Sequence, residues 1–133
     1  MWFLLTLLLY AACDLAFING FAKNFIRQQV GWLLAPSPDL VAAGLFYLVF
    51  TAGLLYFCAA PAQSGGRAAL NGAFFGLVTY ATYELVNKSL LDRWPMALVL
   101  VDLAWGVIVG AVVSWGSWKM AQLIFQGGEI PFR

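Results

Sequence analysis

The chain has 133 residues, of which 63% are hydrophobic and 10% are charged, and its formal net charge is +1. Soluble domains carry about 25% charged residues, so these few charges could not cover the surface of a soluble fold of this composition. The balance indicates a membrane protein and excludes nucleic-acid binding, which needs a basic patch. The sequence has no histidine, which argues against His-ligated haem, zinc sites and Ser–His nucleophile pairs.

Four runs are long and apolar enough to cross a bilayer, which requires roughly 20 residues. They predict transmembrane helices at about 1–22, 40–60, 68–87 and 96–118. Prolines stand at or beside the boundaries, where a missing N–H costs little: Pro36, Pro38, Pro61 and Pro95. We therefore expect one all-α domain over 1–133, a four-transmembrane-helix bundle with short loops and a C-terminal tail at 119–133.

The first run has some features of a signal peptide, since the stretch LLYAACD hints at a lipoprotein cleavage site before Cys13. It lacks the basic segment that such a peptide carries, and Asp14 interrupts its apolar stretch. We expect a retained first helix. Cys13 and Cys58 both fall within spans, where two separate buried thiols are the favoured interpretation and a disulfide is the alternative.

Lysines and arginines in the loops bear on orientation. The first and third loops together hold four of them, and the opposite side holds three. The first set is Lys23, Arg27, Lys88 and Arg93, and the second is Arg67, Lys119 and Arg133. This difference favours loops one and three in the cytoplasm, with both termini on the same side, outside.

Three carboxylates lie inside the predicted spans: Asp14, Glu84 and Asp102. Each costs about 2.5–3.5 kcal/mol at the centre of a membrane helix, so such residues usually face the bundle interior or a wet cavity. At 1.5 Å per residue, they lie roughly 13, 6 and 9 Å from the membrane side that carries loops one and three. The sequence therefore predicts a layer of carboxylates contributed by three helices.

The polar residues around these acids recur at helical spacing and define a candidate ligand or proton site. Its members are Asp14, Tyr80, Tyr83, Glu84, Asn87, Asp102 and Trp105. The alternative is that the acids only fix helix register through hydrogen bonds. Glu84, close to Lys88, is expected to be shallow, wet and ionised. Asp102 or the deeper Asp14 is the better candidate for a neutral functional acid, since burial without a partner favours protonation.

Glycines four residues apart occur on the third and fourth runs: Gly72 and Gly76, then Gly106 and Gly110. Small residues at this spacing let helix backbones approach closely in lipid. Packing within one bundle is the favoured interpretation, and a homodimer seam is the alternative. Five tryptophans near span ends are typical of interfacial belts: Trp2, Trp32, Trp94, Trp115 and Trp118. Trp105 lies inside, where its indole N–H needs a partner that the carboxylates could supply.

Two strings, LNGAFFGLVTYATYELVN (70–87) and WPMALVLVDLAWG (94–106), carry a resemblance to a known family. They resemble the small bacterial membrane proteins grouped as domain of unknown function 2177 (DUF2177). The first half, including 30–57, is similar more loosely. The resemblance implies four spanning helices in a bacterial inner membrane, and it implies no particular activity. It also implies aspartate where this chain has Glu84, a carboxylate one methylene longer.

Two functions remain open from the residues. The carboxylate layer could bind a small molecule or a proton, or the chain could be an accessory subunit within a larger membrane complex. The sequence contains no nucleophile elbow, phosphate loop or dinucleotide fingerprint, which makes an enzyme the less favoured class. We expect the lipid bilayer, other membrane subunits or further copies of the chain as partners, with no metal and no assigned cofactor.

Overall fold

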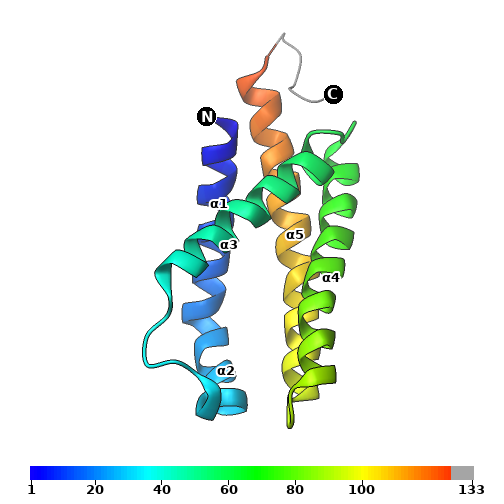
Figure 1. The fold of residues 1–133 in the computed structure, drawn as a ribbon. Coiled ribbons are helices and arrows are strands. Elements are labelled where there is room, and N and C mark those ends of the chain that lie inside the picture. Colours follow the sequence, from blue (N-terminus) through cyan, green and yellow to red (C-terminus); the bar gives the residue numbers. More distant parts are fainter. Residues whose placement is uncertain (127–133) are drawn as a thin grey trace.

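The computed structural model describes residues 1–126, and these are helical apart from short connections (Figure 1). The elements in chain order are α1 (Trp2–Phe17), a π-helical turn η1 (Ile18–Ala22), α2 (Lys23–Val30), a 3-10 turn η2 (Gly31–Leu33), α3 (Leu40–Gly53), a π-helical segment η3 (Leu54–Ala59), α4 (Gly65–Leu90) and α5 (Met96–Ile124). No strand occurs within this part of the chain. The all-α class predicted from the sequence is confirmed.

Within residues 1–126, three helical segments are long and apolar enough to cross a membrane. They are Trp2–Leu33, Leu40–Ala59 and Met96–Ile124, with mean hydropathies of 1.7, 2.1 and 2.4. Four such helices were predicted and three are found, because α4 is not among them. Its 26 residues are long enough, but polar residues such as Asn71, Thr79 and Glu84 lower its hydropathy.

The helices extend beyond the predicted spans. The first continues from residue 22 to Leu33, because the π-helical turn η1 leads directly into α2. The third begins at Gly65, after Ser64 Oγ caps it by accepting from the Arg67 N–H at 3.2 Å. The fourth runs to Ile124, so the expected tail at 119–133 starts as helix, and residues 127–133 lie outside the described part.

The helices alternate in direction, and one of them crosses the others obliquely (Figure 1). α1 and α2 form one rod, α3 crosses it at a steep angle, and α4 and α5 run antiparallel side by side. The start of α1 and the end of α5 lie at one end, where Trp2 Nε1 donates to the Ser117 carbonyl at 2.9 Å. At the other end, the Arg93 guanidinium lies 5.2 Å from the Trp32 ring centre. Loops one and three therefore lie at the same end of the molecule, as we assumed when we compared the depths of the three carboxylates.

α4 and α5 make the most extensive contact in the molecule, and glycines lie at its centre. A Cβ added at Gly76 would overlap the carbonyl oxygen of Gly106, and one added at Gly72 would overlap that of Gly110. Only residues without a side chain permit the two backbones to lie this close. All four predicted packing glycines therefore lie at a contact between two helices of the same chain.

The outer surface is covered by large apolar side chains. Examples from three helices are Val49 (72% exposed), Phe74 (67%) and Leu100 (62%). Continuous apolar exposure of this extent is unfavourable in water, whereas contact with lipid acyl chains is favourable. The surface fits an integral membrane location.

Candidate functional site

Asp14 lies at the junction of three helices and is only 6% exposed. Its Oδ2 accepts a hydrogen bond from the Tyr47 hydroxyl of α3 at 2.6 Å, and its Oδ1 accepts from Trp105 Nε1 of α5 at 3.1 Å. The Trp105 ring stacks on Phe17 with centroids 4.1 Å apart and planes 9° apart. Both carboxylate oxygens therefore have donors from different helices. A carboxylate of the predicted layer does accept the Trp105 N–H.

Glu84 is 1% exposed, which makes it the most buried of the three acids. Its Oε2 accepts from Trp94 Nε1 at 2.7 Å, and Lys88 Nζ donates to the Trp94 carbonyl at 2.6 Å. The expectation that Glu84 is wet was wrong. The turn between α4 and α5 folds Trp94 back over the last turns of α4, which covers the carboxyl although it lies near the end of its helix.

Asp102 is half-buried on α5. It lines a cavity of about 260 Å³ together with Glu84 and Trp94, and its carboxyl interacts with Glu84 and lies within electrostatic range of Asp14. Glu84 and Asp102 thus lie on the wall of one cavity, whereas Asp14 bonds to Tyr47 and Trp105. Within residues 1–126, no three His, Cys, Asp or Glu side chains are arranged to hold a metal ion.

The remaining predicted residues divide between the interior and the outer surface. The Tyr80 hydroxyl faces inward, 3.4 Å from the hydroxyl of the fully buried Tyr10. Tyr83 is 57% exposed, and Asn87 lies beside it one turn later on α4. Tyr83 and Asn87 therefore flank the acids from outside, while Tyr80 and Trp105 lie among the buried groups.

A cavity of about 440 Å³ opens between α3 and α4, next to the acids. We call it the aromatic pocket. Its lining residues are Phe46, Phe50, Thr79, Tyr80, Tyr83 and Asp102. Two of its wall residues, Phe46 (44% exposed) and Tyr83, reach the outer surface. The pocket therefore connects Asp102 with the surface that we expect lipid to cover.

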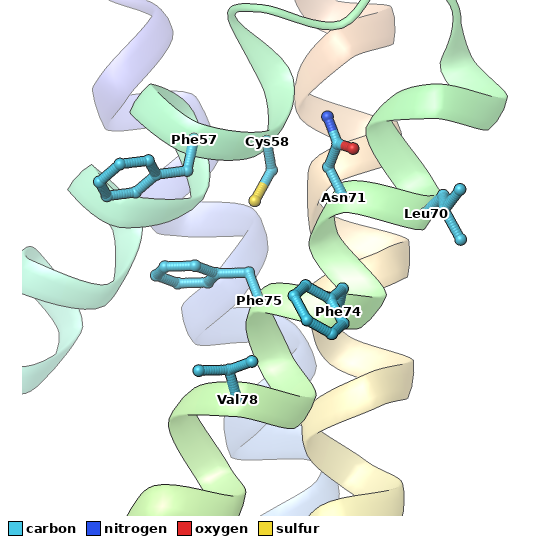
Figure 2. A pocket seen from close by; sticks show the side chains of 7 residues that line it. All are labelled: Phe57, Cys58, Leu70, Asn71, Phe74, Phe75 and Val78. Carbon is cyan, nitrogen blue, oxygen red and sulfur yellow. The ribbon is translucent and has the colours of Figure 1, made fainter.

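A second, larger cavity of about 660 Å³ lies between η3 and α4, nearer the other end of α4 (Figure 2). Its lining is apolar except for Asn71 and Cys58, and the Phe57 and Phe75 rings face each other with centroids 5.8 Å apart. None of the three buried acids lines it. Cys58 and Cys13 are both free thiols, so the disulfide alternative is excluded.

Three residues of the site were not among the predicted candidates: Tyr10, Tyr47 and Trp94. Trp94 was assigned to the interfacial belt because it lies near a span end. Its distance of ten residues from Glu84, across a tight turn ending at Pro95, is the signal that could have paired the two. Tyr47 gave no such signal, because its contact with Asp14 depends on the oblique path of α3 (Figure 1).

Replacing Trp94 with phenylalanine should destabilise the fold by about 2 kcal/mol, because the buried Glu84 carboxyl loses its indole donor. The midpoint of thermal unfolding in detergent micelles measures this. Trp32→Phe is the matched control, since Trp32 is 63% exposed and a phenylalanine ring still faces Arg93. Equal effects of the two substitutions would show that the indole donor to Glu84 contributes nothing specific.

A family model described as "Predicted membrane protein (DUF2177)" matches residues 1–119. Neither a search of curated proteins nor a search of solved structures found a match. Because the family model covers most of the sequence, the chain belongs to the DUF2177 family of predicted membrane proteins.

Proposed function

We propose that this chain is a four-span integral protein of a bacterial inner membrane, and that it binds a proton or a small molecule at a carboxylate site within the bilayer. The site consists of Asp14, Glu84 and Asp102 with the aromatic side chains around them. The proposal has two parts, the membrane path of α4 and the chemistry of the acids.

The membrane path of α4 is supported by its length and its contacts. Its 26 residues span about 39 Å at 1.5 Å per residue, more than the roughly 30 Å hydrocarbon core. Its low hydropathy is compatible with crossing, because Glu84 is buried and the Thr79 hydroxyl donates to backbone carbonyls of its own helix. Polar residues of a membrane helix are tolerated when they face the bundle or bond to backbone.

The observation that carries the chemical part is that Glu84 and Asp102 interact at the wall of one cavity, and that neither forms an ion pair among the described residues. Within residues 1–126, the single ion pair is the exposed contact of Arg93 with Asp92, and Lys88 donates to a carbonyl. Two adjacent anions repel strongly where the dielectric constant is low. One proton held between the carboxyls removes this repulsion, and a bound ligand of positive charge would do the same.

The site lies toward the end of the molecule that carries α2 and the α4–α5 turn (Figure 1). The predicted excess of lysine and arginine in loops one and three belongs to the same end. Under the positive-inside rule, this supports an orientation with the site nearer the cytoplasm and both termini outside.

Infrared spectroscopy of the protein in lipid tests whether a carboxyl group holds an exchangeable proton. We expect a protonated-carboxyl stretching band that shifts in deuterated water and changes with bulk pH. Glu84→Gln and Asp102→Asn should each remove or displace that band, because each leaves one acid of the pair without its partner.

The matched control is Asp39→Asn. Asp39 is exposed and caps α3 by accepting from the Val41 and Ala42 N–H groups, a role that asparagine fills equally well. This substitution should leave the band unchanged. A band that does not respond to bulk pH while the protein stays folded would overturn the proposal, and would make the acids purely structural.

A further inference from the structure

The walls of the aromatic pocket are built mainly from ring faces and edges. Phe46 and Phe50 of α3 have centroids 5.9 Å apart, and the Phe50 and Tyr80 rings meet edge to face at 5.9 Å. Tyr83 completes the opposite wall one turn from Tyr80. Ring faces carry a partial negative charge that attracts cations, most effectively where water is excluded.

The polar groups of the pocket point to the same class of ligand. Among residues 1–126, Asp102 is its single carboxylate, and no lysine or arginine lines it. The Thr79 hydroxyl already donates to the Phe75 carbonyl at 2.8 Å. The pocket therefore offers negative charge and lacks a positive group with which to hold an anion.

The pocket opens sideways, toward the surface that faces lipid in our account. The N-terminal half of α3 diverges from α4 (Figure 1), and the cavity is lined by residues of both helices and by Asp102 of α5. Its mouth is marked by Phe46 and Tyr83, both substantially exposed. A ligand arriving from the bilayer must itself be largely apolar.

We infer that the aromatic pocket binds a hydrophobic organic cation, with its positive centre against Asp102 and its apolar groups against Phe46, Phe50, Tyr80 and Tyr83. The volume of about 440 Å³ falls within the range of roughly 300–1,000 Å³ that is typical of small-molecule sites. This inference rests on the proposed function and names the ligand class for the same carboxylate site.

Equilibrium binding of tetraphenylphosphonium to the purified protein in lipid nanodiscs tests the inference. We expect saturable binding by the wild type. Asp102→Asn keeps the shape of the side chain but removes its charge, and should weaken binding on the order of a hundredfold. Tyr83→Leu should weaken it about fivefold, whereas Tyr83→Phe, which keeps the ring, should leave it unchanged.

Two controls separate the effect of charge from that of hydrophobicity. Tetraphenylborate has the same shape and the opposite charge, and we expect no saturable binding of it. Phe74→Leu alters the other cavity (Figure 2) and should leave binding of the cation unchanged. Equal binding of both ions, or equal binding by wild type and Asp102→Asn, would overturn the inference.

Failure of this inference can be told apart from failure of the proposed function. If the pH-dependent carboxyl band is present and tetraphenylphosphonium does not bind, the proton site stands and the cation assignment is wrong. If the carboxyl band does not respond to bulk pH but tetraphenylphosphonium binding is saturable and depends on Asp102, the cation assignment is supported and the proton site is wrong.

Discussion

Replacing Gly76 with alanine is expected to lower the free energy of unfolding by about 3 kcal/mol. The added methyl group would overlap the Gly106 carbonyl oxygen, and a backbone atom can move away only if α5 moves with it. Overpacking in a well-packed interior typically costs about 1–3 kcal/mol, and a rigid backbone neighbour places this site at the upper end. Unfolding by increasing sodium dodecyl sulfate in mixed micelles measures the change.

Gly44→Ala is the matched control for this substitution. Gly44 also lies within a helix, α3, but nothing is within 4 Å of the position that its Cβ would take. Alanine is favoured over glycine inside a helix by about 1 kcal/mol, so this variant should be as stable as the wild type or more stable. A Gly76→Ala protein that unfolds like Gly44→Ala would show that α4 and α5 do not meet at these glycines.

Replacing Asp14 with alanine is expected to cost about 4 kcal/mol. The change leaves the Tyr47 hydroxyl and the Trp105 N–H without their acceptor, and each unpaired buried donor costs about 1–3 kcal/mol. These two donors hold α3 and α5 against α1, so the loss affects the contact of three helices. The effect should be larger than that of any single exposed substitution on α1.

Asp14→Asn should have an intermediate effect, because asparagine retains one acceptor oxygen. We expect it to cost about 2 kcal/mol, half the effect of alanine. Unfolding by sodium dodecyl sulfate in mixed micelles, followed by total tryptophan fluorescence, measures both values. Equal costs for asparagine and alanine would contradict the two-donor arrangement.

Much of the helical framework follows from the sequence because apolar run length and breakers dominate in a membrane chain. Pro61 and Pro95 mark connections that the structure also has, and the antiparallel order follows from short loops. Two features did not follow. α4 is less apolar than a run count suggests, and α1 continues into α2 because the amphipathic stretch after Ala22 remains helical.

The site was predictable in part, because buried acids must face other helices. The proximity of Glu84 and Asp102 could be expected from their depths, and so could a carboxylate partner for Trp105. The burial of Glu84 could not, since depth along a helix does not reveal which side chain folds over it. Trp94 supplies that cover across the turn, and Tyr47 reaches Asp14 only because α3 lies obliquely.

The central claim is that Glu84 and Asp102 act as one unit inside the membrane, and a double-mutant cycle tests it most directly. The unfolding free energies of Glu84→Gln, Asp102→Asn and the double variant are compared with that of the wild type in the same mixed micelles. Our account predicts a coupling energy of about 1 kcal/mol or more, since either change alone removes the shared interaction. Effects that add within about 0.5 kcal/mol would mean that the two carboxyls do not interact, and would contradict the account.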